Sequence, residues 1–263
     1  MPRLISFLSD FGTSDTYVGQ VKGAIATAAP EAVVVDLTHQ VPAQDVRAGA
    51  FLLWTAVEAF PPGSVHLAVV DPGVGTARRA VAARSARGDV FVGPDNGLLP
   101  MALARLGGAQ AVIELTNTEF HRLSRSDTFH GRDLFGPVAA YLARGTDVEL
   151  LGTEAGALAS PYAMPAPRKE LDHWVGQVLH VDAYGNLITS FTPELLPPRF
   201  EVVVADRRIR GGLSHHYQAV DTGELLAVIG SAGLLELSVR DGSAAMMLGL
   251  ERDAPVVLRA FGA

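Results

Sequence analysis

The chain has 263 residues, of which 48% are hydrophobic and 19% are charged, and its formal net charge is -7. A chain of this length and composition forms one large or two modest globular domains with a substantial core. The acidic balance excludes a chain-wide basic field that would bind nucleic acid or anionic lipid. The absence of cysteine excludes disulfides, thiolate nucleophiles and cysteine-based metal sites. A small neutral or cationic ligand fits this charge better.

The N-terminal segment predicts a strand rather than a targeting sequence. Its apolar run, residues 4–8, is short and leads into a polar loop that contains Asp10. No apolar span is long enough to cross a bilayer, so we expect a cytoplasmic protein that binds neither membrane nor nucleic acid. A helical pattern begins at Tyr17, and Asp15 or Thr16 could cap that helix. Asp10 lies too early to be the cap and is left free to bind a pair of ligand hydroxyls.

Strands and helices alternate through the first 160 residues. Apolar, β-branched runs predict further strands at residues 32–37, 66–70, 90–93 and 111–115, and helical spacing predicts helices at 17–26, 45–60, 100–106 and 134–144. This alternation indicates an α/β domain with a largely parallel sheet. Ligands of such sheets bind beyond the carboxyl ends of the strands, where this chain places several polar side chains.

The strand at residues 66–70 delivers Asp71 to this edge of the sheet. Pro72 ends the strand, and a glycine-rich loop follows that can approach a ligand closely. Arg78 and Arg79 come directly after the loop. A buried carboxylate needs a cation or several donors, so the pattern predicts a charge pair set into a pocket. The pair could belong to a functional site or could be a structural salt bridge that closes the loop.

A second polar cluster precedes the helix predicted at residues 134–144. Thr128 or Asp133 is enough to cap that helix, which leaves His130 unexplained by local structure. A lone histidine is more often a core or surface residue than a catalyst. Here it is flanked by an aromatic residue, a glycine and a candidate ion pair, so we interpret His130 as a functional residue.

The pattern changes after the proline-rich stretch at residues 159–169. We place the domain boundary there, between an N-terminal α/β domain (residues 1–160) and a C-terminal domain (residues 172–263). Short apolar runs predict strands at residues 174–181, 186–191, 200–204, 225–229, 235–239 and 255–259, with one helical turn at 243–248. Short strands separated by Gly, Pro, Asp and Asn turns indicate a small β-barrel or sandwich.

Two loops of the C-terminal domain carry polar groups. Residues 182–186 read DAYGN, and residues 230–233 read GSAG. Their Asp, Asn and Ser side chains could bind an amino acid or a purine, or the two loops could serve only as turns.

Six motifs, in order along the chain, resemble the S-adenosyl-L-methionine (SAM) hydroxide adenosyltransferases, which are adenosine-forming SAM hydrolases related to the fluorinases and chlorinases. The motifs are SDFGTSDTYVG, VDPGVGTARR, GPDNGLL, TFHGRDLFGP, DAYGN and GSAGLLEL. Six ordered motifs are far more specific than a single glycine pattern. The resemblance implies an α/β domain followed by a β-barrel domain. It also implies a homotrimer, with SAM bound between the N-terminal domain of one subunit and the C-terminal domain of its neighbour.

The resemblance further implies a reaction and a set of roles. Water or hydroxide attacks the ribose C5′ of SAM and gives adenosine and L-methionine, with no metal and no cofactor besides the substrate. By motif position, the catalytic residues are Asp71, Arg78 and His130. The substrate-binding residues are Asp10 for the ribose diol, Thr128 and Phe129 before the histidine, Asp182, Tyr184 and Asn186 for adenine and methionine, and Ser231 for the methionine carboxylate.

The chemistry suggests how the three catalytic groups divide the work. Water is a poor nucleophile, so an enzyme without a metal must remove a proton during attack or hold a hydroxide-like water on cations. Our hypothesis is that Arg78 and His130 orient the water and lower its pKa. Asp71 would fix both the arginine and the imidazole tautomer.

Other functions stay open at this point. A SAM- or adenosine-binding sensor without significant turnover would use the same pocket. A SAM-dependent halogenase is disfavoured, because halogenases carry Tyr where Asp71 stands and Tyr-Ser where His130 and Gly131 stand. Ala232 replaces an Arg of fluorinase, which leaves the methionine carboxylate to backbone N–H groups or to another subunit. A metal-dependent phosphohydrolase would also use strand-end carboxylates, but few histidines lie near them.

Overall fold

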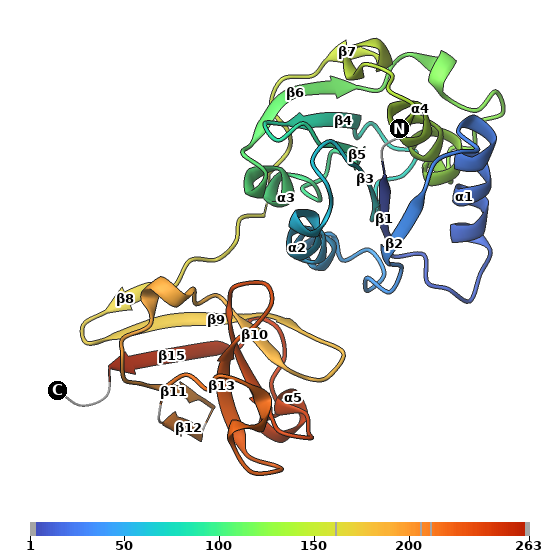
Figure 1. Cartoon of the computed structure of the whole chain (residues 1–263). Helices are drawn as coiled ribbons and strands as arrows, with labels where there is room; N and C mark the ends of the chain where they lie inside the picture. Colours follow the sequence, from blue (N-terminus) through green and yellow to red (C-terminus); the bar gives the residue numbers. More distant parts are fainter. Residues whose placement is uncertain (1–3, 161, 206, 211, 261–263) are drawn as a thin grey trace. The chain divides into compact units, whose positions relative to one another are not determined.

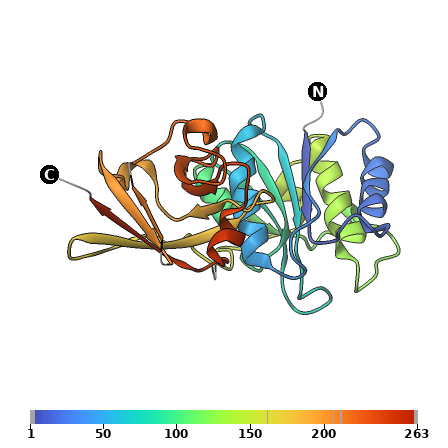
Figure 2. The ribbon, with the colours of Figure 1, turned by 90° about the horizontal axis from the view of Figure 1, so that it is seen from below.

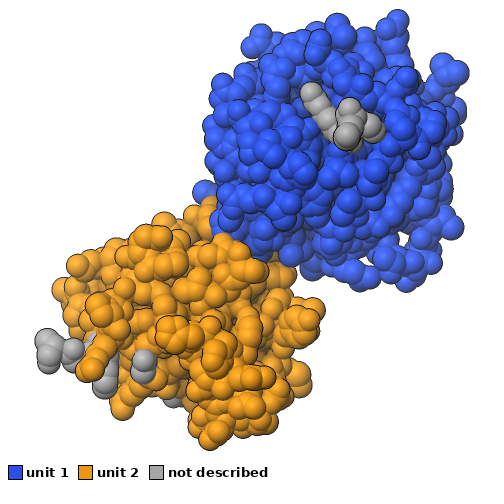
Figure 3. Space-filling view, viewed as in Figure 1, with its two compact units in different colours: residues 1–163 blue, residues 164–263 orange. Residues whose placement is uncertain are grey.

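The structure is a computed structural model that describes residues 4–160, 162–205, 207–210 and 212–260. The chain divides into two compact units, Met1–Ala163 and Met164–Ala263 (Figure 3). The first is an α/β unit and the second is built on an antiparallel, barrel-like sheet, which confirms the predicted fold class (Figure 1). Within the described ranges, none of the helices has the length and apolar character needed to span a bilayer.

The first unit is built on a mixed seven-stranded sheet. Its strands are β1 (Ile5–Ser9), β2 (Val34–Thr38), β3 (Val65–Val69), β4 (Ala80–Ser85), β5 (Val90–Pro94), β6 (Ala109–Glu114) and β7 (Thr153–Glu154). They lie in the order β2-β1-β3-β5-β4-β6-β7. The first four of these run parallel, whereas β4, β6 and β7 each pair antiparallel with their neighbours.

Helices cover both faces of this sheet. They are α1 (Tyr17–Ala28), α2 (Val46–Ala56), α3 (Pro100–Arg105) and α4 (Gly136–Ala143), with short turns at η1 (Val57–Ala59), η2 (Thr118–Phe120), η3 (Gly131–Phe135) and η4 (Val148–Leu151). One core lies under α1 and α4 and the other under α2 and α3 (Figure 2). In β3 and the residue after it, Leu67 and Val69 face the first core, whereas Ala68 and Val70 face the second. A strand buried on both faces is apolar throughout, as this one is.

Strands β4 and β7 of the first unit are not predicted from the sequence, and β4 is the one that bears on the site. Its residues are mostly small and include Arg84, so no apolar run marks it. β4 pairs antiparallel with β5, and Ala80 lies opposite Pro94. The start of β4 therefore lies at the carboxyl end of β5, at the edge of the sheet where the chain leaves β3. This return brings Arg78 back towards Asp71.

The start of one helix and the cap of another differ from the sequence-based expectations. α1 begins at Tyr17 as predicted, but the side chain of Thr16 makes no capping hydrogen bond. The helix predicted from Leu134 begins earlier, as the π-helical turn η3, and Asp133 does not cap it. Asp133 is instead fully buried and accepts hydrogen bonds from Arg122, Arg132 and the backbone N–H of Ser126. Its charge is satisfied by two guanidinium groups and one amide, which a helix cap could not supply.

The second unit is an antiparallel eight-stranded sheet that nearly closes into a barrel. Its strands are β8 (Arg168–Glu170), β9 (His173–Val181), β10 (Leu187–Thr189), β11 (Phe200–Val204), β12 (Arg207–Arg210), β13 (Leu225–Ile229), β14 (Leu235–Val239) and β15 (Pro255–Ala260). They lie in the order β12-β11-β15-β9-β10-β14-β13, and β8 pairs with β9. Short helices connect them at η5 (Pro193–Leu195), η6 (Tyr217–Ala219) and α5 (Ala244–Leu248).

All six strands predicted for this unit are present. The additional strands β8 and β12 were not predicted because their sequences, RKE and RRIR, are mostly charged. The core is built by inward side chains such as Val178, Leu187 and Leu237, which are fully buried. Alternating inward and outward residues is the pattern expected of a small barrel.

Candidate active site

The structure brings Asp71, Arg78 and His130 together at the carboxyl edge of the first sheet. The Nε atom of Arg78 lies 3.0 Å from Oδ1 and 3.1 Å from Oδ2 of Asp71. Its Nη2 atom donates to Oδ2 of Asp71 and, at 2.7 Å, to Nδ1 of His130. The Asp71 and Arg78 side chains are only 6% and 11% exposed, and His130 is 3% exposed. The three groups therefore form a buried chain from carboxylate to guanidinium to imidazole.

Arg78, rather than Asp71, holds the imidazole of His130. A guanidinium can only donate, so Nδ1 of His130 must accept and Nε2 carries the proton of the neutral ring. This corrects the sequence-based hypothesis that Asp71 orients the imidazole, because Asp71 is bound to Arg78 and acts on the ring only through it. Burial, and then the charges of Arg78 and Arg125, lower the pKa of His130, so the ring is neutral at pH 7.

Two glycines let the loops of this site pack closely. Gly75 has a φ of +77°, and a Cβ at this position would lie 2.6 Å from the carbonyl oxygen of Asp127. A Cβ at Gly131 would lie 3.1 Å from the ring of Phe11. Any side chain at Gly75 would push apart the loop of Asp71 and the loop of His130, so glycine is needed where the two loops meet.

Asp10 and Thr128 also lie at the carboxyl edge of the sheet. Ser9 pairs with Val69, so Asp10 and Asp71 leave neighbouring strand ends. Asp10 is partly exposed, and its Oδ2 accepts a 2.8 Å hydrogen bond from the backbone N–H of Gln44. One carboxylate oxygen is thus engaged within the protein. Thr128 is exposed.

Phe129 belongs to a cluster of three aromatic rings. Its ring centroid lies 5.8 Å from that of Phe11 and 5.4 Å from that of Tyr17, both edge-on. Tyr17 is 48% exposed, so the cluster reaches the surface. Edge-to-face aromatic packing of this kind fixes ring positions. The ring of Phe129 is therefore held in a fixed position and offers an apolar surface next to His130 in the chain.

The polar residues at the end of β5 have structural partners. The Nε atom of Arg79 donates to Asp95 at 2.8 Å, and its Nη2 donates to the carbonyl of Ala157 at 2.7 Å. Asn96 donates to the carbonyl of Val70 at 2.9 Å. These contacts brace the strand ends, so of the two arginines after the glycine-rich loop only Arg78 faces His130.

The predicted residues of the C-terminal domain line one cavity of the second unit. Asp182, Tyr184, Asn186 and Ser231 all lie on its wall, and its volume is about 940 Å³. Asp182 accepts three hydrogen bonds of 2.9 Å, from the backbone N–H groups of Tyr184 and Asn186 and from the Asn186 side chain. Asp182 therefore holds the loop in shape, while Tyr184 is 81% exposed and Ser231 is exposed.

Glu236, on β14, is a residue of this cavity that the sequence analysis missed. It is 6% exposed, and the hydroxyl of Tyr217 donates to its Oε2 at 3.1 Å. Burial, together with the nearby Asp182, raises the pKa of Glu236, and burial raises the pKa of Tyr217 to about 12. The signal that could have found Glu236 is the pattern LLELSV, where a carboxylate interrupts a strand that is otherwise buried.

Arg125 is the other residue that sequence analysis missed. Its Nη2 atom lies 3.1 Å from Nε2 of His130, on the side of the ring opposite Arg78. It lies in an exposed loop, where the sequence shows no periodic pattern. No sequence signal identifies this arginine, because a loop residue's contacts depend on the path of the whole loop.

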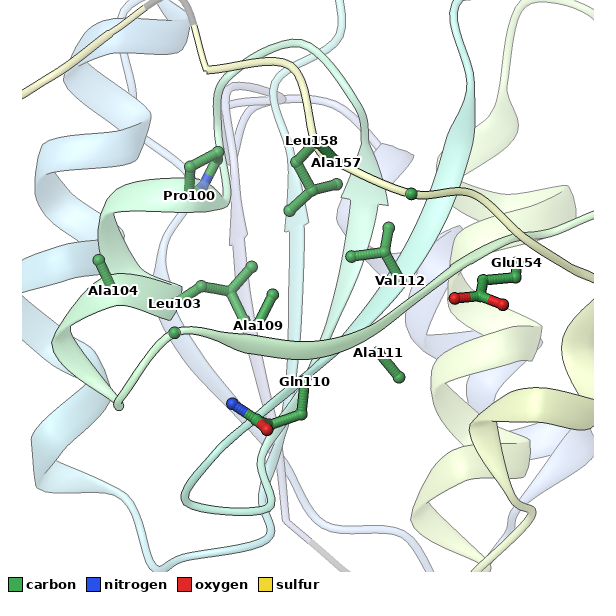
Figure 4. A pocket seen from close by; sticks show the side chains of 12 residues that line it. Pro100, Leu103, Ala104, Ala109, Gln110, Ala111, Val112, Glu154, Ala157 and Leu158 are labelled. Carbon is green, nitrogen blue, oxygen red and sulfur yellow. The ribbon is translucent and has the colours of Figure 1, made fainter.

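A further cavity of the first unit has a different character. It measures about 470 Å³ and lies between α3, β6 and the segment after β7 (Figure 4). Aliphatic residues such as Leu103, Val112 and Leu158 line it, and Glu154 is its one ionisable side chain. Within the described ranges, no cluster of three or more His, Cys, Asp or Glu side chains could hold a metal ion. The ionisable and polar candidate residues therefore lie around His130 and in the cavity of the second unit.

Comparison with known proteins shows what this chain resembles. A model of the SAM hydroxide adenosyltransferase N-terminal domain matches residues 5–152, and a model of the C-terminal domain of the same family matches residues 176–257. The chain is 43% identical to the (R)-S-adenosyl-L-methionine hydrolase of Salinispora tropica, with 94% of each chain covered. It is 41% identical to that of Thermus thermophilus, over 97% of this chain and 99% of the relative.

More distant relatives and solved structures agree with this match. A fluorinase of Actinopolyspora mzabensis is 29% identical over 71% of each chain. The crystal structure of an uncharacterized conserved protein from Thermotoga maritima superposes with a TM-score of 0.91 at 35% identity, covering 97% of this chain and 99% of that one. Asp71, Arg78 and His130 lie within the N-terminal match, and Asp182 and Ser231 lie within the C-terminal match. The chain therefore belongs to the SAM hydroxide adenosyltransferase family.

Proposed function

We propose that this protein hydrolyses S-adenosyl-L-methionine to adenosine and L-methionine. The observation that carries the proposal is the buried chain of Asp71, Arg78 and His130, which presents an imidazole N–H beside a cation at the edge of the sheet. Relatives named (R)-S-adenosyl-L-methionine hydrolase match nearly the whole chain. The sulfonium of SAM leaves as a neutral thioether, so this site needs to activate a water and does not need an acid for the leaving group.

The proposed reaction is an in-line displacement at C5′. The water loses one proton to solvent, and its oxygen forms the new bond to C5′. The C5′–S bond breaks, and its electron pair stays on sulfur, which leaves as methionine. Desolvation favours this step, because hydroxide and sulfonium lose their opposite charges as they react. Alignment of oxygen, C5′ and sulfur contributes more than the roughly 10²–10⁴-fold that positioned acid–base groups supply.

The contacts of the three residues support distinct roles. Asp71 forms an ion pair with Arg78 and fixes the direction of its guanidinium. Arg78 holds the lone pair of His130 at Nδ1, which leaves Nε2–H as a donor to the attacking oxygen. The positive charge of Arg78 lowers the pKa of a water bound beside it. This division differs from the initial hypothesis only in placing Arg78 between Asp71 and the ring.

Halogen transfer fits the site less well. A Cβ at Gly131 would lie 3.1 Å and 3.3 Å from two ring carbons of Phe11. A serine at this position, as halogenases have, would require Phe11 to move. The packing around Gly131 therefore disfavours the Tyr-Ser pair that halogenases carry here.

We further propose that residues of both units bind one SAM molecule in a homotrimer. Asp10 would bind the ribose diol, with Thr128 and Phe129 beside it, and Asp182, Tyr184, Asn186 and Ser231 would bind adenine and methionine from a neighbouring subunit. The support is the family resemblance, together with the division of the proposed residues between two compact units. The cytoplasmic location stays a prediction.

The reaction can be tested with SAM in water labelled with oxygen-18. We expect adenosine with the label in its 5′-hydroxyl, together with unlabelled L-methionine, over many turnovers per protein molecule. Bound SAM with less than one turnover would instead identify a sensor. A 5′-halo-5′-deoxyadenosine formed in chloride or fluoride would identify a halogenase. Either result would contradict the proposal.

The shared site can be tested by mixing two impaired variants and measuring activity at SAM concentrations well below KM. Asp71→Asn impairs catalysis by the N-terminal half of the site, and Asp182→Ala impairs SAM binding by the C-terminal half. If SAM binds between neighbouring subunits, co-expression of the two variants restores sites that pair an intact N-terminal half with an intact C-terminal half. Each variant alone is the control, and light scattering should show a trimer. No recovery in mixed oligomers, or an active monomer, would contradict the shared site.

A further inference from the structure

Both ring nitrogens of His130 face an arginine. Nδ1 lies 2.7 Å from Nη2 of Arg78, and Nε2 lies 3.1 Å from Nη2 of Arg125. A guanidinium has no lone pair to offer, and a neutral imidazole has only one. Only one of the two contacts can therefore be a hydrogen bond at a time, and the other brings an N–H group against an N–H group.

Arg78 is the partner that takes the lone pair of His130. It is bound to both oxygens of Asp71, and its guanidinium carbon lies 5.3 Å from the centre of the Phe135 ring. Arg125 lies in an exposed loop, and among the residues that the structure describes it makes no hydrogen bond or ion pair other than its contact with His130. The firmly held donor fixes the lone pair at Nδ1. The Nε2–H of His130 and an N–H of Arg125 are therefore two donors side by side.

Two adjacent donors without an acceptor are satisfied when one anionic oxygen accepts from both. Hydrogen bonds from a charged donor to an oxyanion are the strong ones in proteins, and they replace the repulsion between the donors with attraction. We propose that Arg125 completes a hydroxide-binding site with the Nε2–H of His130 and stabilises the attacking oxygen as an anion. This inference rests on the proposed hydrolysis of SAM, to which it adds a fourth catalytic residue.

The charges around His130 favour an anion at this point. Arg78 and Arg125 contact the ring, and Asp71 contacts Arg78. Asp127 and His121 lie close enough to interact electrostatically with His130. Asp71 offsets one of the two guanidinium charges, which leaves Arg125 as the uncompensated cation in direct contact with the ring. An added cation lowers the pKa of a bound water, so Arg125 increases the fraction of hydroxide at a given pH.

The pH dependence of SAM hydrolysis tests this role. The activity of the wild-type protein should rise with pH as the bound water ionises. In Arg125→Ala, we expect this rise to move up by about one pH unit, and kcat/KM to fall about tenfold at pH 7, since one pH unit corresponds to a tenfold change in hydroxide. Arg125→Lys, which keeps the charge, should recover most of the loss. Arg122→Ala is the matched control, because Arg122 lies in the same loop but binds Asp133.

A binding measurement tests the site without turnover. In NMR spectra assigned with His130→Ala, azide should shift the imidazole signals of His130 in the wild-type protein, and Arg125→Ala should weaken that effect at least tenfold. If azide binds through Arg125 but the wild-type protein releases no adenosine, the anion site stands and the proposed function fails. If adenosine is released but Arg125→Ala matches the wild type in pH profile or in azide binding, the role of Arg125 is wrong.

Discussion

The two regions that carry the proposed site satisfy their carboxylates in different ways. In the first unit, Asp71 is bound by the guanidinium of Arg78, which in turn binds His130, and all three side chains are buried. In the second unit, Asp182 is bound by amides of its own loop, and Glu236 by a single tyrosine hydroxyl. The first arrangement fixes charges relative to one another, and the second fixes the shape of a loop.

This difference suggests that the two regions affect different kinetic constants. Fixed charges stabilise a transition state without reorganising, which raises kcat. An open cavity of about 940 Å³ with exposed groups such as Tyr184 and Ser231 is suited to binding substrate, which sets KM. Variants of the first region should therefore lower kcat, and variants of the second should raise KM.

The largest change in a kinetic constant is expected for Asp71→Asn, which should lower kcat. Loss of the carboxylate leaves the charge of Arg78 uncompensated and frees its side chain to turn away from His130. We expect kcat to fall roughly 10²–10⁴-fold, as for loss of a positioned catalytic group, with SAM binding nearly unchanged. Adenosine release followed by chromatography gives kcat, and calorimetry gives the affinity for SAM. Turnover at the parental rate would show that the three residues are not the catalytic set.

Asp182→Ala should raise KM and leave kcat nearly unchanged. The substitution removes three hydrogen bonds that hold the loop of Tyr184 and Asn186. Each such bond contributes about 1 kcal/mol, part of which the loop recovers with water, so we expect KM to rise roughly 10- to 100-fold. The kcat at saturating SAM should stay within about threefold of the wild type. A large fall in kcat without a change in KM would break the proposed division between the regions.

At low pH, protonation of His130 in the first region should lower kcat/KM, whereas the second region should contribute no such effect. The pKa of His130 lies below the ordinary value of about 6.5 because of burial and the charges of Arg78 and Arg125, so the neutral ring persists below that pH. As pH falls through the lowered pKa, the ring gains a proton and loses its hydrogen bond from Arg78, and kcat/KM should then fall up to tenfold per pH unit. Asp182→Ala should show the same acidic limb. A pH profile with no break below pH 6.5, besides any rise from ionisation of the bound water, would contradict the assignment to His130.

The smallest effect is expected for Gly230→Ala, in the wall of the second cavity. A Cβ at this position would lie 1.6 Å from Oε1 of Glu236, so the carboxylate must move. Displacing a buried side chain in this way costs about 1–3 kcal/mol of stability, measurable by denaturant unfolding. Gly19→Ala on α1 is the control, because a Cβ there meets nothing within 4 Å and alanine favours a helix. Equal stability of the two variants would show that Glu236 is not held against Gly230.

Much of the fold could be predicted because its elements carry local patterns. The apolar run before Asp71 marks β3, which is buried on both faces, and the short apolar runs after residue 172 mark the strands of the second unit. Strands β4, β7, β8 and β12 were not predicted because small, polar or charged residues form them, and only pairing with a neighbouring strand makes them strands. Asp10, Asp71 and His130 were singled out as polar groups beside strongly patterned segments, whereas the full set of site residues and their roles came from the family resemblance.

The sequence by itself determined the alternation of strands and helices, the change to short strands after the proline-rich stretch, and the position of Asp71 at the end of a core strand. Each depends on residues close together in the chain, whose spacing reflects local geometry. Only the tertiary structure decided that Arg78 lies between Asp71 and His130, that Arg125 contacts the other ring nitrogen of His130, and that Glu236 is buried beside Tyr217. The physical reason is that a hydrogen bond depends on distance in space, and the return of the chain through β4 and the loop before η3 sets those distances.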